Sequence, residues 1–142
     1  MVRSSAIKGD RSWLSADSSL LLSGYVKVGK TTETAITKFT STFAPSWTIR
    51  IASTGQSRAI TAAGSSYAAI LSKSMIASIT GWKPSKAQLL VIAFDSKGVM
   101  TSAFGSAELG EPIALAYSKE LGLVGLAQSA DLAPAVFRIA AR

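Results

Sequence analysis

Short stretches in which apolar and polar side chains alternate recur along the chain, and this alternation restricts the fold more than any other feature of the sequence. The run WTIRI at residues 47–51 shows it most cleanly. Residues 23–28 and 35–43 follow the same pattern, and Pro45 separates the second of these stretches from the WTIRI run. Because successive side chains of a β-strand point to opposite faces of a sheet, each stretch predicts a half-buried strand.

The second half of the chain contains five further stretches of strand-like composition. We interpret them as two hairpins and a final strand: residues 87–94 with 99–104, residues 112–117 with 121–127, and residues 135–140. The sequence DSKG at residues 95–98 provides the turn of the first hairpin. Many short strands joined by turns are typical of stacked or closed antiparallel sheets. We therefore expect a mainly β domain, either an antiparallel β-sandwich of jelly-roll-like type or a barrel.

Residues 65–80 have the spacing of a helix. Tyr67, Ile70 and Leu71 occupy positions i, i+3 and i+4, which share one helical face, and Gly81 would end the helix. We expect one short helix over this stretch. Its Ser, Ile and Thr residues are weaker helix formers, so two short strands are the alternative.

The first 19 residues differ in composition from the rest of the chain. They are polar, rich in serine and mixed in charge, and Trp13 and Leu14 are their only bulky apolar pair. A segment of this composition has little to bury by itself, so it is either disordered or ordered against a neighbour. We expect residues 1–19 to form an extended arm that acts in assembly through Trp13 and Leu14. Residues 20–142 are long enough for a single β domain.

The chain of 142 residues contains neither cysteine nor histidine. Thiolate and imidazole serve as nucleophile, base or ligand in Ser-His-Asp triads, cysteine enzymes and most zinc or non-haem iron sites, so these classes are excluded. Glu108 and Glu111 are the closest pair of carboxylates, but they fall in a turn-like segment with glycine and proline, where solvated side chains are expected. We predict that the protein is not an enzyme and that it binds no metal or cofactor.

No membrane span or export signal is predicted. The uncharged stretch between Arg58 and Lys73 is shorter than the roughly 20 apolar residues that cross a bilayer. The first apolar cluster, residues 20–22, is too short for the core of a signal peptide. We expect no membrane partner.

Positive charge is concentrated in one part of the sequence. Residues 34–94 contain no Asp or Glu, and the net charge of the whole chain is +7. Six basic residues fall within this part: Lys38, Arg50, Arg58, Lys73, Lys83 and Lys86. Such segregation predicts a positive face that contacts nucleic acid or the acidic surface of a neighbouring protein. The alternative is that the charge only keeps the protein in solution.

Residues 24–31, GYVKVGKT, match the phosphate-loop consensus GxxxxGK[ST]. With the leucines before it, the segment resembles the opening of a Ras-like small GTPase. The resemblance implies that Lys30 contacts phosphate, Thr31 contacts magnesium and Asp95 lies in the second shell of the metal. The chain lacks that family's Asn-Lys-x-Asp motif, and residues 25–28 alternate as a strand where a phosphate loop needs small residues. We therefore predict a strand here and no nucleotide binding.

A mainly β domain with a polar arm, small side chains and segregated charge is typical of chains that tile with copies of themselves. Viral coat, decoration and tail proteins are the most familiar class of this kind, and the analogy is one of fold type alone. Our first hypothesis is a structural subunit of a virion. It would assemble in the cytoplasm of a host and contact copies of itself, other structural proteins and, without sequence preference, nucleic acid. A monomeric nucleic-acid-binding β-barrel is the second hypothesis, and a phosphate-loop nucleotide hydrolase is the third.

Overall fold

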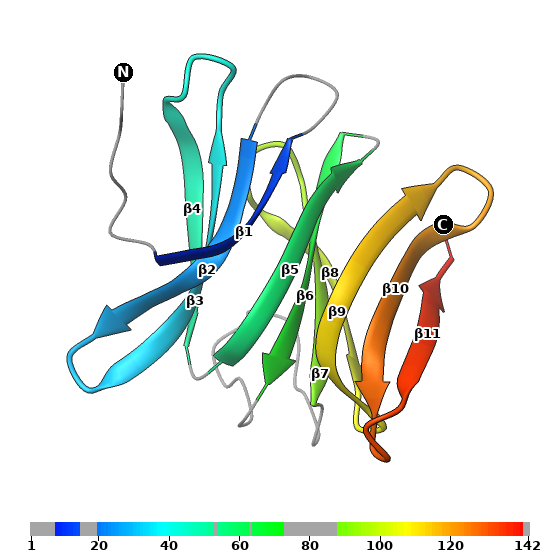
Figure 1. The fold of residues 1–142 in the computed structure, drawn as a ribbon. Coiled ribbons are helices and arrows are strands. Elements are labelled where there is room, and N and C mark those ends of the chain that lie inside the picture. Colours follow the sequence, from blue (N-terminus) through cyan, green and yellow to red (C-terminus); the bar gives the residue numbers. More distant parts are fainter. Residues whose placement is uncertain (1–7, 15–19, 53, 63, 73–87, 141–142) are drawn as a thin grey trace.

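The computed structural model describes residues 8–14, 20–52, 54–62, 64–72 and 88–140, and within these ranges it contains eleven strands and no helix (Figure 1). The strands are β1 (Lys8–Leu14), β2 (Leu20–Val28), β3 (Thr31–Phe39), β4 (Pro45–Ala52), β5 (Thr54–Ala62), β6 (Ser65–Ser72), β7 (Leu89–Phe94), β8 (Met100–Ser106), β9 (Leu109–Ser118), β10 (Gly122–Ser129) and β11 (Pro134–Ile139). Every pairing among them is antiparallel. The prediction of a mainly β, antiparallel fold is confirmed.

Three sheets follow one another along the chain. The N-terminal sheet has the strand order β1-β2-β3-β4, the central sheet β5-β6-β7-β8, and the C-terminal sheet β9-β10-β11. Each strand therefore pairs with its neighbours in sequence, and each sheet is an up-and-down meander. The described strands leave all three sheets open. Of the two predicted architectures, the structure therefore has the sandwich-like arrangement and not the closed barrel.

The central sheet is the middle layer of a three-layer stack. The core between the N-terminal and central sheets contains Leu21, Ile36, Ile51, Ala68, Ile70, Leu90, Ile92 and Phe94. The core between the central and C-terminal sheets contains Ala69, Leu89, Val91, Leu115, Leu123 and Ala127. Figure 1 shows the three sheets in this order, with β5 against the N-terminal sheet and β9 against the central sheet.

Strand β7 explains why the central sheet lies inside. Its sequence, LLVIAF, is apolar at every position, and all six residues are buried. Leu90 and Ile92 point toward the N-terminal sheet, while Leu89 and Val91 point toward the C-terminal sheet. A strand without a polar face has to be covered on both sides, so this run fixes the middle layer.

The predicted helix over residues 65–80 is wrong for its first half. Residues Ser65–Ser72 form β6, which pairs with β5 and β7, and residues 73–80 lie outside the described ranges. Like β7, β6 contributes to both cores, with Ala68 and Ile70 on one face and Ala69 on the other. A strand that is apolar on both faces also satisfies helical spacing, so the spacing alone misassigned it.

Three hairpin turns share one geometry, those that connect β3 to β4, β7 to β8 and β10 to β11. In each, the first residue donates its N–H to the carbonyl of the fifth, and the fourth donates to the carbonyl of the first, at 2.8 to 3.1 Å. The fourth residue has a positive φ: 58° at Phe43, 82° at Gly98 and 61° at Leu132. Glycine suits this left-handed position, whereas Phe43 and Leu132 occupy it with large exposed side chains.

Candidate functional site

The structure separates the three predicted basic contacts that it describes. Lys38 lies directly opposite Trp47 in the β3–β4 ladder, so both belong to the face that packs on the central sheet. Arg50 belongs to the opposite face, where its guanidinium forms a 2.7 Å ion pair with Glu33. Arg58 on β5 donates from Nε to a backbone oxygen of β9 at 3.1 Å. Lys38, Arg50 and Arg58 therefore do not form one positive face.

The other predicted contacts fall largely outside the described part of the chain: Lys73, Lys83 and Lys86, together with residues 1–7 and 15–19 of the arm. The middle of the predicted arm, residues 8–14, forms β1. Its backbone pairs with β2, and both Trp13 and Leu14 are in register with that strand. These two predicted assembly contacts thus belong to the first strand of the N-terminal sheet, and their role in assembly stays a prediction.

The segment that matches the phosphate-loop consensus is a β-hairpin. Strand β2 leads into a two-residue turn, Gly29-Lys30, and β3 begins at Thr31. Gly29 has a φ of 61°, which suits the first position of a two-residue hairpin turn. The prediction that the YVKV segment is a strand is confirmed.

Asp95, the residue that the GTPase resemblance would place near magnesium, lies far from Lys30. It belongs to the β7–β8 turn, where its Oδ1 accepts hydrogen bonds from the N–H groups of Lys97 and Val99, both at 2.9 Å. Trp47 at the start of β4 donates its indole N–H to a backbone oxygen of this turn at 3.1 Å. The turn is therefore beside the end of β3 that is remote from Lys30, and a strand of nine residues spans about 30 Å. Lys30 and Asp95 cannot hold the same metal-bound nucleotide.

Carboxylates do not cluster in the described residues. No group of three or more His, Cys, Asp or Glu side chains in these ranges could hold a metal ion. Glu108 is exposed in the turn between β8 and β9, as predicted, and its N–H donates to Ser106 Oγ at 3.2 Å. Glu111 instead lies within β9, because the ladder with β10 begins earlier than the sequence indicated.

Among the described residues, the C-terminal sheet has a core contact on one face only. Its inner face supplies Leu115, Leu123 and Ala127 to the second core. Two rows of side chains cross the middle of its other face, between Gln128 and Ser118: Ala114, Leu126 and Val136 in one, and Ala116, Val124 and Arg138 in the other. All are apolar except Arg138, whereas a sheet with one solvated face usually carries polar side chains on that face. We call these six residues the apolar outer face.

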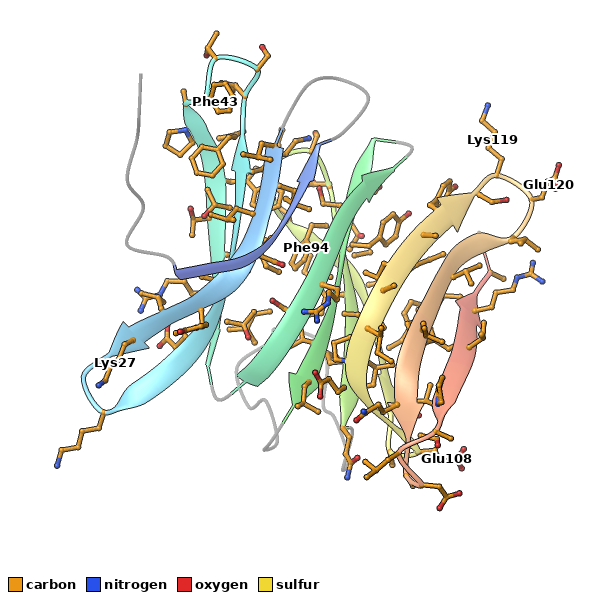
Figure 2. All side chains as sticks on the ribbon, viewed as in Figure 1. Lys27, Phe43, Phe94, Glu108, Lys119 and Glu120 are labelled. Atoms are coloured by element: carbon orange, nitrogen blue, oxygen red, sulfur yellow. The ribbon has the colours of Figure 1, made fainter. Side chains whose placement is uncertain are left out.

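Charge in the C-terminal sheet is placed mainly at its two ends. Lys119 and Glu120 lie in the β9–β10 turn, and Glu108 lies in the turn before β9 at the other end (Figure 2). Arg138 donates from Nε to the backbone oxygen of Leu121, which also belongs to the β9–β10 turn, at 2.6 Å. The middle of the apolar outer face is therefore uncharged.

Sequence reasoning did not single out this face. It predicted the three strands correctly, but apolar side chains occur at both even and odd positions in them, so alternation did not tell which set is buried. The signal that could have identified the face was the absence of charge between Glu120 and Asp131. A one-sided sheet would usually have polar residues at every second position there.

Comparisons of the chain with models of protein families, with curated proteins and with solved structures found no match. In the described ranges, no helix is long and apolar enough to cross a membrane. The geometry of the three sheets and their surfaces is thus the basis for a functional interpretation.

Proposed function

We propose that this protein is a structural subunit that assembles with copies of itself. The observation that carries the proposal is the apolar outer face, which no described part of the chain covers. Val136 at its margin is 74% exposed, and Ala114 and Ala116 are exposed as well. Contiguous apolar surface of this kind marks protein interaction sites, because its removal from water contributes roughly 25 cal/mol per Å².

The finer proposal is a component of a virion, such as a coat, decoration or tail protein. Its support is the type of architecture: short antiparallel strands stacked in layers, with an uncovered face that a neighbouring subunit can occupy. This is an analogy at the level of fold type, since the same architecture serves many functions.

A neighbouring subunit is a better-supported partner than nucleic acid. Phosphate recognition without sequence preference needs several cations on one surface. Lys38 and Arg50 occupy opposite faces of the N-terminal sheet, and Arg50 already forms an ion pair with Glu33. Association through an apolar sheet face needs no such cluster.

Sedimentation velocity of the full chain over a range of concentrations tests the proposal. We expect reversible association that Val136→Lys weakens, because a charge at this exposed position of the apolar outer face opposes its burial. Ala130→Lys is the matched control, since it adds the same charge to the exposed β10–β11 turn of the same sheet.

Two outcomes would contradict the proposal. A chain that stays monomeric at all concentrations is not a self-assembling subunit. A monomer whose binding to oligonucleotides weakens steeply with salt would support the nucleic-acid-binding alternative instead.

A further inference from the structure

Each sheet ends in two edge strands, which have no partner on their far side among the described strands: β1 and β4, β5 and β8, and β9 and β11. Of these six strands, β11 is the one whose ladder with its neighbour runs without a register shift. It is also the strand of the C-terminal sheet most remote from the central sheet. The strand that lies against the central sheet is β9, at the other edge (Figure 1). The backbone N–H and C=O groups on the outer edge of β11 therefore face no described strand, and they can pair with a strand of another copy.

The edge of β11 has few of the features that usually prevent pairing between edges. Natural edge strands are protected by short length, bulges, charged side chains or prolines. The β10–β11 ladder runs through six successive pairs without a register shift, whereas the β3–β4 and β7–β8 ladders each contain one. Pro134 stands only at the first position of β11, and Arg138 is its only charge.

We infer that β11 pairs antiparallel with β11 of a second copy, so that two C-terminal sheets join into one sheet of six strands. This inference rests on the proposed function and names the contact through which the copies meet. Such a pairing relates the two copies by a two-fold axis, the commonest symmetry of protein oligomers. It also joins the two apolar outer faces into one continuous surface.

Charge and exposure favour a register in which Val136 faces Val136 of the partner. Residues directly opposite in a ladder share a face. For the outer faces of both copies to lie on the same side of the joined sheet, one residue of β11 must therefore stand opposite the same residue of the partner. Centring on Val136 brings the two most exposed apolar side chains of the strands together. It also sets Arg138 opposite the partner's Pro134, which keeps the two guanidinium groups apart.

Cysteine cross-linking tests this pairing directly, because the natural chain has no cysteine. Directly opposite residues of an antiparallel pair have Cα atoms about 4.5 to 5.5 Å apart, which is within the range of a disulfide. Under mild oxidation we expect Val136→Cys to form a disulfide-linked dimer at least about tenfold faster than Leu132→Cys, because pairing raises the effective concentration of the two thiols. Leu132 is the matched control, since it is 74% exposed like Val136 but lies in the turn before β11.

A third variant distinguishes edge pairing from stacking of the outer faces. Ala116→Cys lies on the same face but on β9, two strands from the edge, and we expect it to remain unlinked. In addition, the backbone amide hydrogens of β11 should exchange with solvent more slowly in the assembled state than in dilute monomer, because edge pairing protects N–H groups that face stacking leaves free.

The outcomes separate this inference from the proposed function. Association in which Ala116→Cys cross-links and Val136→Cys does not would overturn the edge pairing while leaving self-assembly intact. Equal rates for Val136→Cys and Leu132→Cys would also overturn it, because both would then reflect random collision. Absence of association at any concentration would overturn both proposals.

Discussion

Strands β7 and β11 have the same length and both contain mainly apolar residues, yet they occupy different environments. Both have six residues; β7 reads LLVIAF and is buried throughout, while β11 reads PAVFRI and alternates between exposed and half-buried. The difference is one of layer: β7 is a central strand of the middle sheet, and β11 is an edge strand of an outer sheet. Apolar side chains on both faces of β7 therefore stabilise the fold, whereas in β11 those on the outer face, such as Val136, present a surface.

Mutations in the two strands should therefore act differently. A side chain of β7 touches a neighbouring sheet whichever way it points, so truncation of a large side chain there leaves a cavity. In the C-terminal sheet only inner-face residues such as Leu123 do so, while outer-face residues such as Val136 lose little when shortened. We expect substitutions in the core of the central sheet to lower the free energy of unfolding, and substitutions on the outer face of the C-terminal sheet to weaken association.

The largest effect is expected for Ile92→Ala in β7. Ile92 is fully buried between the N-terminal and central sheets, so its truncation should lower the free energy of unfolding by about 2 to 5 kcal/mol. Val136→Ala in β11 should change it by less than about 0.5 kcal/mol, since surface substitutions rarely do more. Urea unfolding of the monomer measures both, and equal losses would contradict the assignment of β7 and β11 to different environments.

The next effect is expected for Gly125→Ala in the inner face of the C-terminal sheet. The Phe137 ring lies across Gly125, and an added Cβ would overlap it, so the ring must move out of the second core. We expect a loss of about 1 to 3 kcal/mol, as for other overpacked sites. Gly110→Ala is the matched control, because the nearest atom to its Cβ is Gln88 Oε1 at 3.6 Å. Thermal unfolding distinguishes the two, and similar melting temperatures would show that the inner face tolerates repacking.

A smaller effect is expected in the β7–β8 turn of the central sheet and the β10–β11 turn of the C-terminal sheet, which share one geometry. Gly98→Ala should lower stability by about 1 to 2 kcal/mol, because alanine is strained in the left-handed region. In addition, the new Cβ would lie 2.8 Å from Trp47 Cγ. Leu132→Gly, at the equivalent position of the β10–β11 turn, should change stability by less than about 1 kcal/mol, since relief of strain offsets the entropy of glycine. Chemical denaturation checks both, and a large loss for Leu132→Gly would mean that the exposed leucine side chain stabilises the monomer.

The smallest effect is expected on the face of the N-terminal sheet that points away from the central sheet. The Arg50–Glu33 ion pair is partly exposed, with side-chain exposures of 50% and 21%, so Arg50→Gln should lower stability by at most about 1 kcal/mol. Salt should reduce the difference between Arg50→Gln and the natural chain, because it screens exposed charges. Unfolding at low and high ionic strength measures this. A loss as large as that of Ile92→Ala would contradict the view that stability resides mainly in the central sheet.

Much of the strand pattern was determined by the sequence alone. The alternation at residues 47–51 and the turn at 95–98 rest on spacing and on turn-forming residues, which act over a few neighbours. The same local chemistry identified the YVKV segment as a strand in spite of its phosphate-loop letters. These predictions agree with β4, with the β7–β8 hairpin and with β2.

Only the tertiary structure decided which faces are covered. Residues Ser65–Ser72 fit a helix by spacing but form a strand, because pairing with β5 and β7 satisfies their backbone and two sheets bury their side chains. Lys38 and Arg50 lie in the same basic part of the sequence, but the pairing of β3 with β4 places their side chains on opposite faces of the N-terminal sheet. The apolar outer face depends likewise on which of two apolar sets meets the central sheet. Spacing along a strand defines two faces but does not distinguish them, and it is contact between residues distant in sequence that buries one and leaves the other exposed.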